Sequence, residues 1–422
     1  MKYVNKYTIA ILGLLVIVGL GTLYFFSDDD AESSVAYTDF TTSNYYDTTI
    51  AMRMFHEEGE DLEDLTNELH EILEKTHRLS TWFVAYEGLV NVKTINDNPG
   101  EYHTVDPLLF DMLELSIEYY DITDGYFDIT LGPVIDVWDE HRERCLGWQE
   151  SLRGEENSHE IYEQEKDQYC TIPEQSTLDA ANAYVGIEGL HLDKDNYQVM
   201  IEAGMRLDLG GMAKGYGAKM LGEVLKDDER IEAFILNAGT SNVEVYGDHP
   251  YRDNDLFYIG ITNPENPFGL ENTYATIKME SGKNATTSGD YDRYYEVDGR
   301  KYHHLINPYT LYPTDHHKAV TMVSEDGAFG DILVTAVFIM PLEEGLDYVN
   351  GRDDLEAIWF EDSCVAPVMS EAFEAQYLRH FTLDFDCDEG RDVFMTVVLL
   401  AILTLFASST GLYYFLYGRK KR

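Results

Sequence analysis

The sequence predicts an α+β domain. Residues 61–78 and 108–120 carry apolar side chains at the three- and four-residue spacing of amphipathic helices. Short runs that alternate in the manner of strands lie at 198–201, 233–236, 243–246 and 257–261. Residues 211–225 are again helical by their spacing. Because strands and helices interleave without a strict βαβ rhythm, the α+β class is favoured.

Apolar stretches flank this domain at both ends of the 422-residue chain. Residues 7–26 have the length of about 20 residues that a bilayer core requires. Three aspartates follow Ser27 in place of a small-x-small cleavage site, which favours an uncleaved anchor. A second stretch, residues 393–417, ends in four basic residues. Because Lys and Arg collect on the cytoplasmic side, we expect a cell-membrane protein with both termini cytoplasmic and an extracytoplasmic domain.

The chain therefore divides into four predicted parts. They are a transmembrane anchor (1–27), a polar tether (28–43), one globular domain (44–386) and a C-terminal transmembrane helix with a basic tail (391–422). Within the domain, residues 139–176 are charged and weakly periodic, so we expect a surface insertion there.

Charge and cysteine content narrow the function. With 78 acidic against 30 basic residues the net charge is -48, which excludes nucleic acid as a partner. The four cysteines show no CxxC or Cys/His cluster, so they are either disulfides or free thiols. Of the three possible pairings, Cys145 with Cys170 and Cys364 with Cys387 close the shortest loops.

A first candidate site is the glycine-containing segment 208–216, DLGGMAKGY, which opens a helix. Paired glycines let backbone approach a ligand, and the free N–H groups of a helix N-terminus attract phosphate. Lys214 adds a mobile cation. A tight turn that needs glycine only for packing remains the alternative, because the segment matches neither GxxxxGK[ST] nor GxGxxG.

A second candidate is segment 286–313, with hairpin character around Asp298-Gly299. Its aromatic residues could simply pack a sheet face. Adjacent side chains on a strand point to opposite sides, so at most one of His303 and His304 faces a site.

A third candidate is the start of the apolar helix from Gly330 to Met340. Asp331 and Thr335 are four residues apart and share one helix face, offering a carboxylate and a hydroxyl to one hard cation. The alternative is an N-cap Asp beside a Thr that bonds back to its own helix.

Taken in this order, the segments resemble the ApbE family of FAD:protein FMN transferases. Residues 125–133 with Trp138 are similar to its G-x-FD-x-T-x-GP…W signature, and 208–216 to its DLGG-x-AKGY. Residues 287–291 resemble TSGDY, and 295–308 resemble YYEVDG-x-x-x-HH-x-x-x-P. The resemblance extends from about residue 48 to about residue 340 and implies a T-fold-related catalytic domain.

The family's residue roles carry over to matching positions. The resemblance implies that the FAD site is lined by Trp82, Tyr126, Phe127, Asp128, Asp208, Lys214 and Ile306. It implies that Mg²⁺ is held by Asp331, Thr335 and the backbone carbonyl of Gly211. His304, rather than His303, aligns with the histidine implicated in transfer, so His304 and Asp331 are the expected catalytic residues.

The activity implied by the resemblance is Mg²⁺-dependent transfer of FMN from FAD to a threonine hydroxyl of an acceptor, with release of AMP. The family's acceptors point to a flavoprotein subunit of a membrane redox complex or an extracellular electron-transfer protein. There are two alternatives: an FAD pyrophosphatase, which uses the same site with water in place of the threonine, and a non-catalytic flavin-binding redox module, which would tolerate loss of Asp331 or His304.

Several positions depart from the family pattern. Tyr46-Asp47-Thr48 stands in place of MGT, and Thr240-Ser241 in place of the Gly-Asp that follows NAG. Asn307 replaces an Asp and Leu311 a Gly. Because the metal pair and His304 are intact, we expect altered FAD contacts or acceptor preference rather than lost activity.

Overall fold

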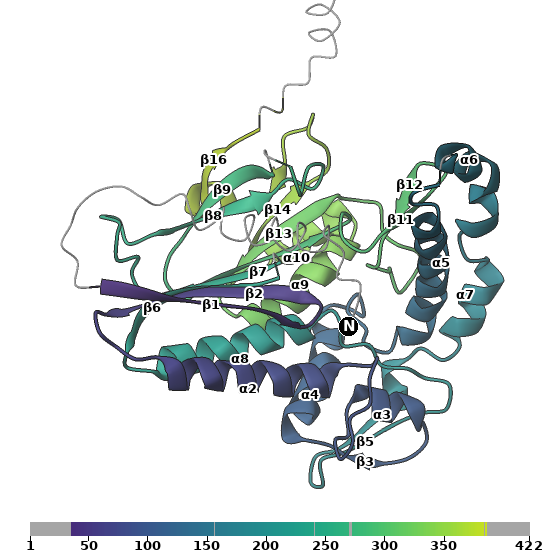
Figure 1. Ribbon diagram of the computed structural model, residues 1–422, viewed down its shortest axis with the longest axis horizontal. Coiled ribbons are helices and arrows are strands. Elements are labelled where there is room, and N and C mark those ends of the chain that lie inside the picture. The colour runs from purple at the N-terminus through teal and green to yellow at the C-terminus, as the bar shows by residue number, and fades with distance from the viewer. Residues whose placement is uncertain (1–34, 156, 240, 270–271, 384, 386–422) are drawn as a thin grey trace, which may run out of the picture. The chain divides into compact units, whose positions relative to one another are not determined.

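A large antiparallel sheet organises the chain. The computed structural model describes residues 35–155, 157–239, 241–269, 272–383 and 385. Eight strands are paired in the order β1-β2-β6-β7-β10-β13-β14-β15, and every recorded pairing is antiparallel (Figure 1). Their bounds are Val35–Tyr45, Thr48–Glu57, Ile231–Ala238, Asn242–Tyr246, Lys283–Gly289, Ala319–Ser324, Glu356–Phe360 and Val368–Met369.

Three smaller sheets complete the strand content. One has the order β16-β9-β8 (Leu378–Phe381, Thr273–Met279, Phe257–Thr262), and another β3-β5-β4 (His103–Thr104, Gln198–Ile201, Leu190–Asp193). The third is the hairpin of β11 (Tyr295–Val297) and β12 (Arg300–Tyr302). Asp298 and Gly299 at its turn have φ of 52° and 76°, as a two-residue hairpin turn requires, so the predicted hairpin is confirmed.

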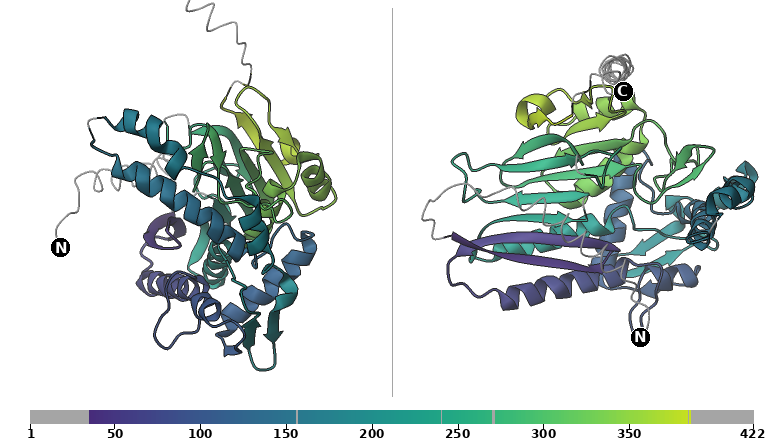
Figure 2. Two further views of the ribbon diagram at one scale, coloured as in Figure 1. Left: turned by 90° about the vertical axis from the view of Figure 1, so that its right-hand side faces the viewer. Right: turned by 45° about the horizontal axis from the view of Figure 1, so that its top comes forward.

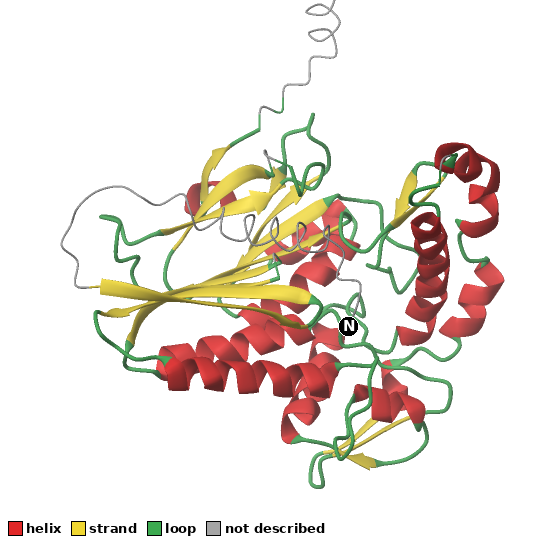
Figure 3. Ribbon diagram, in the orientation of Figure 1, coloured by secondary structure: helices red, strands yellow, loops and turns green. Residues whose placement is uncertain are grey.

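Helices cover one face of the large sheet (Figure 3). Here α2 (Glu63–Ser80) lies beside α8 (Ala213–Asp227), and both pack on the strands through one apolar cluster. Leu65, Leu69 and Leu73 of α2 are almost fully buried in that cluster, as the helical spacing predicts. The right-hand view of Figure 2 shows α2 running along the β1–β2 hairpin.

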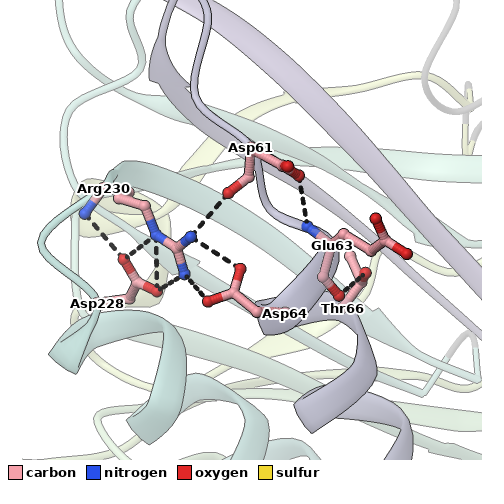
Figure 4. A network of polar contacts seen from close by, with 6 residues as sticks. All are labelled: Asp61, Glu63, Asp64, Thr66, Asp228 and Arg230. Atoms are coloured by element: carbon pink, nitrogen blue, oxygen red, sulfur yellow. Dashed lines mark hydrogen bonds and ion pairs between the residues drawn. The ribbon is translucent and has the colours of Figure 1, made fainter.

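A polar network fastens the ends of these two helices together (Figure 4). Arg230, between α8 and β6, donates to the carbonyl of Asp61 at 2.7 Å and to the carboxylate of Asp64 at 2.8 Å. It also donates to Asp228 at 2.6 Å. Asp64 lies in the first turn of α2, so the network joins the start of that helix to the end of α8.

The central strands β10 and β13 are covered on both faces. Thr286 and Ser288 face α9 (Gly327–Ile339), where a Cβ on Gly330 would lie 3.1 Å from the Thr286 hydroxyl. Ala285 and Thr287 face the other way and line a small cavity with Ile259 and Ile277 of the β8–β9 sheet. All six residues of β13 are buried in consequence.

The remaining helices lie around this centre. They are α3 (Val92–Asp97), α4 (Pro107–Ile122), α5 (Gly132–Ser151), α6 (Ser158–Tyr169), α7 (Gln175–Asn182), η1 (Ile187–Gly189), α10 (Leu342–Asn350) and α11 (Phe373–Gln376). The expected insertion at 139–176 falls on α5, α6 and the start of α7, so it is regular helix. The predicted Cys145–Cys170 disulfide is confirmed. Cys364 is also disulfide-bonded, and Cys387 lies outside the described residues.

The α+β prediction is confirmed by the antiparallel sheets and the separate helices. The two predicted membrane spans, 7–26 and 393–417, lie outside the described residues. Within the part of the chain that the structure describes, none of the helices has the length and apolar character needed to cross a bilayer.

Candidate functional site

The glycine segment forms an extended loop that enters α8. It does not follow directly on a strand, because β5 ends at Ile201. The Asp208 N–H donates to the Ile129 carbonyl at 2.8 Å, and its carboxylate accepts the Gly210 N–H at 2.7 Å. A Cβ on Gly211 would lie 3.1 Å from the ring of Phe127. The loop thus lies against the 127–129 segment, and three predicted site residues come together.

Asp331 lies where α8 and α9 approach most closely. A Cβ on Gly215 would be 2.5 Å from the Cβ of Asp331, so the bare glycine allows this approach. The Asp331 side chain is 7% exposed, and its carboxylate accepts the Gly215 N–H at 3.1 Å. That amide is in the first turn of α8, where N–H groups have no helical partner. Asp331 is in the second turn of α9 and is not its N-cap.

Lys214 provides the positive charge beside Asp331. Its ammonium lies 3.6 Å from the Asp331 carboxylate and donates to the Ser241 hydroxyl at 2.6 Å. The Ser241 carbonyl in turn accepts the Thr287 N–H at 2.7 Å. Ser241, one of the departures from the family pattern, therefore joins Lys214 to the edge of β10.

The predicted magnesium ligands lie on adjoining segments. The Thr335 hydroxyl, one turn after Asp331, donates to the Asp331 carbonyl at 2.9 Å and lies 3.5 Å from the Ser288 hydroxyl. Gly211 lies four residues before Gly215, whose amide binds Asp331. One buried carboxylate with hydroxyl and carbonyl oxygens is the donor set that Mg²⁺ prefers, so the residues fit that ion. No group of three or more His, Cys, Asp and Glu suited to a metal occurs among the described residues.

The two adjacent histidines have different environments, just past the end of β12. His303 is fully paired: its Nε2–H donates to the Thr314 carbonyl at 2.7 Å, and its Nδ1 accepts the Leu305 N–H at 3.1 Å. The buried Nδ1 of His304 has no hydrogen-bond partner among the described residues. His303 is therefore structural, and His304 has a nitrogen left for a ligand.

His304 is neutral at physiological pH. Burial, together with the nearby His303, Arg293, Arg142 and Lys214, lowers its pKa to about 3. Lys214 is one of the charges that lower the pKa of His304, so His304 lies within electrostatic reach of the Asp331–Lys214 pair.

The described contacts of the other predicted FAD-site residues are with residues outside the Asp331–Lys214 pair. The Tyr126 hydroxyl donates to Glu344 at 3.0 Å, and Asp128 accepts the amide and hydroxyl of Thr130 at 2.7 and 2.6 Å. Trp82 stacks on Phe83, with ring centroids 3.7 Å apart. Ile306 is 3% exposed and belongs to an apolar cluster around α5.

Three polar residues at these positions were not predicted from the sequence. Ser288 and Ser241 contact Thr335 and Lys214, and the guanidinium of Arg206 lies 3.6 Å from the Trp82 ring centroid. Ser288 could have been predicted from the sequence, because it belongs to the segment that matches TSGDY. It also lies two residues after Thr286 and therefore on the same face of the strand. Arg206 carried no spacing signal.

The fold places the chain in a class of protein that includes solved ApbE proteins. The ApbE protein of Thermotoga maritima is 25% identical and superposes with a TM-score of 0.64 over 81% of this chain and 99% of that one. The apo flavinyl transferase ApbE of Pseudomonas stutzeri is 22% identical, with a TM-score of 0.63 over 82% of this chain and 98% of that one. The similarity to the Pseudomonas stutzeri protein is a similarity of fold.

The sequence model of the ApbE family matches residues 46–359, and the chain belongs to that family. An FAD:protein FMN transferase of Klebsiella pneumoniae is 27% identical over 64% of this chain and 74% of that protein. The enzyme of the same name from Haemophilus influenzae is 27% identical over 56% of this chain and 61% of that protein, so the matched part is less than two thirds of its length.

Proposed function

We propose that this chain is an Mg²⁺-dependent flavin transferase that moves FMN from FAD to a threonine hydroxyl of an acceptor protein and releases AMP. Its similarity to proteins named FAD:protein FMN transferase supports the activity. The observation that carries the proposal is the Asp331–Lys214 pair, which combines a buried carboxylate and a cation beside a glycine turn.

The diphosphate of FAD would lie over this pair. Gly210 and Gly211 have no side chains to block its approach, and Lys214 offers a positive charge at the end of a flexible stem. Asp331, Thr335 and the Gly211 carbonyl would hold Mg²⁺. When bound there, the ion would neutralise the phosphate oxygens and make the phosphorus more reactive.

His304 would accept the proton of the acceptor threonine. The threonine oxygen bonds to the phosphorus on the FMN side, the P–O bond to the bridging oxygen breaks, and that oxygen leaves with AMP. In the free protein the pKa of His304 is held down by burial and by nearby cations. A bound diphosphate brings negative charge close to those cations, which raises the pKa of His304 and makes it a better base.

The flavin and adenosine parts would lie along the 126–128 segment, Asp208 and Trp82. The ring of Phe127 lies against the glycine turn, which would place an aromatic side chain beside the diphosphate. The side chain of Ile306 is buried in the cluster around α5, so this residue would meet FAD through its main chain.

We also propose that the domain works outside the cytoplasm, anchored by its two apolar ends. The Cys145–Cys170 disulfide supports this, because such bonds persist mainly in oxidising compartments. The acceptor would then be a flavoprotein subunit of a membrane redox complex or an extracellular electron-transfer protein.

The test is incubation of the purified chain with FAD and Mg²⁺, with and without a threonine-containing acceptor domain, followed by chromatography of nucleotides. We expect AMP to appear only when the acceptor is present and to stop on chelation of Mg²⁺. AMP and free FMN without acceptor would instead identify a pyrophosphatase. Unchanged FAD in both samples would leave only flavin binding.

A further inference from the structure

A helical arm packs beside the candidate site. We define the disulfide arm as α5, α6 and α7, residues 132–182, which lie next to the β11–β12 hairpin (Figures 1 and 2). Cys145 on α5 and Cys170 after α6 are both buried and joined, with their Cα atoms 4.5 Å apart. The disulfide therefore joins α5 to the residue that directly precedes Thr171.

Two hydrogen bonds tie the arm to residues 295–313, which we call the histidine segment. The indole N–H of Trp138 donates to the Leu311 carbonyl at 2.8 Å. The Tyr295 hydroxyl donates to the carbonyl of Thr171 at 3.0 Å. One anchor is therefore on α5 and the other is the residue that follows the disulfide.

The apolar contacts join the same two parts. The ring of Trp138 stacks on Tyr302 with centroids 5.6 Å apart. Both cysteines share one buried cluster with residues of the histidine segment. The buried members of this cluster are Leu131, Val134, Trp138, Cys145, Trp148, Cys170, Leu178, Tyr295, Ile306 and Leu311.

His304 lies between two residues of its segment that pack with the arm. Tyr302 and Ile306 pack with the arm, whereas His303 contacts Phe338 of α9 and Leu305 packs in the central core. Arg142, one turn after Trp138 on α5, is one of the cations close enough to affect His304.

We infer that the disulfide arm positions His304. Trp138 and Thr171 are positioning residues that fix the histidine segment at its two ends, and the Cys145–Cys170 bond keeps these two anchors in register. The consequence for turnover depends on the proposed transferase function, whereas the consequence for the order of the histidine segment does not.

The main test compares Cys145→Ser/Cys170→Ser with Cys364→Ser/Cys387→Ser in the purified full chain. Because a misplacement of about 1 Å costs on the order of 100-fold in rate, we expect kcat for AMP release to fall at least 10-fold in the first variant. The KM for FAD should change less than kcat. The second variant, which leaves the arm intact, should match the parent.

Hydrogen exchange of residues 295–313 gives a readout independent of activity. We expect faster exchange there in Cys145→Ser/Cys170→Ser, with β6, β10 and β13 unchanged. Trp138→Phe and Tyr295→Phe, which each remove one anchoring hydrogen bond and retain an aromatic ring, should show the same change to a smaller extent. If the cysteine variant does not fold, these two carry the test.

The inference is overturned if exchange of 295–313 and kcat both match the parent in all of these variants. It is also overturned if exchange rises equally across the whole sheet, because the arm would then stabilise the domain in general. A parent chain that releases no AMP would contradict the proposed function, and the exchange comparison would still decide the role of the arm.

Discussion

The carboxylate of Asp331 lies 3.6 Å from the ammonium of Lys214, although the two side chains come from different helices. The same carboxylate accepts the amide of Gly215, the residue after Lys214. Because Gly215 has no Cβ, α9 approaches α8 closely enough for both contacts. Packing of the two helices and assembly of the candidate site therefore both depend on glycine at position 215.

Replacing Asp331 by Asn should abolish turnover while preserving the fold. The amide oxygen can still accept the Gly215 N–H, but the negative charge that faces Lys214 and would bind Mg²⁺ is lost. We expect AMP release to fall on the order of 100-fold or more. Calorimetric titration with Mg²⁺ should show weakened binding.

The matched control is Asp347→Asn, an exposed carboxylate on α10. It should leave AMP release unchanged. Equal losses in both variants would mean that net charge matters and that Asp331 is not a ligand.

Gly215→Ala should destabilise the chain, because its methyl group would meet the Cβ of Asp331 at 2.5 Å and the Gly327 carbonyl at 3.0 Å. We expect a loss of about 1–3 kcal/mol in the free energy of unfolding, measured in urea. Gly147→Ala is the control, since Gly147 is an exposed residue of α5 and no atom lies within 4 Å of an added Cβ. That change should stabilise by about 0.5–1 kcal/mol.

Substitution of His304 should lower activity, whereas substitution of His303 should lower stability. His304→Asn should lower AMP release on the order of 100-fold with an unchanged urea midpoint, because its Nδ1 has no described partner to lose. His303→Asn should cost about 1–3 kcal/mol of unfolding free energy, since it loses its fixed bonds to Thr314 and Leu305. The reverse pattern would assign the catalytic role to His303.

Acid should destabilise the fold through its buried histidines. Burial lowers the pKa of His317 to about 4, against about 6.5 in an unfolded chain. Unfolding therefore takes up a proton between these values, and the stabilising effect, complete above pH 6.5, is lost as pH falls towards 4. Burial also lowers the pKa of His303 to about 4, so this residue makes stability depend on pH in the same way.

Urea unfolding at pH 7, 5.5 and 4.5 checks this, with His317→Gln for comparison. The variant keeps a donor for the Met340 carbonyl, which His317 bonds at 3.2 Å, but has no titrating ring. Its stability should fall with acid less steeply than that of the parent, by up to about 1.4 kcal/mol per pH unit. Identical slopes would show that His317 does not take part.

Much of the fold was predictable because its signals are local. The leucines of α2 and the Asp298-Gly299 turn are determined by helical spacing and by backbone conformations that few residues adopt. The helices α5 and α6 were missed as regular elements because few of their residues are buried: five of the 20 residues of α5 and none of α6. Their sequences therefore carry little amphipathic pattern.

The candidate site was predictable only in part, for a similar reason. Asp331 and Thr335 share one helix face, so their spacing indicates a common ligand. Ser241 lies in the short connection between β6 and β7, and its contact with Lys214 at the start of α8 follows from tertiary packing that no sequence spacing records. The position of Ile306 in the arm cluster likewise depends on a contact with α5 that the family motif does not encode.

The most direct test of the central claim is the intact mass of an acceptor domain after incubation with the chain, FAD and Mg²⁺. The proposed function predicts a gain of one FMN minus water, one AMP released for each acceptor labelled, and no gain when the acceptor threonine is replaced by Ala. An acceptor of unchanged mass, with FAD either intact or split to free FMN and AMP, would contradict it.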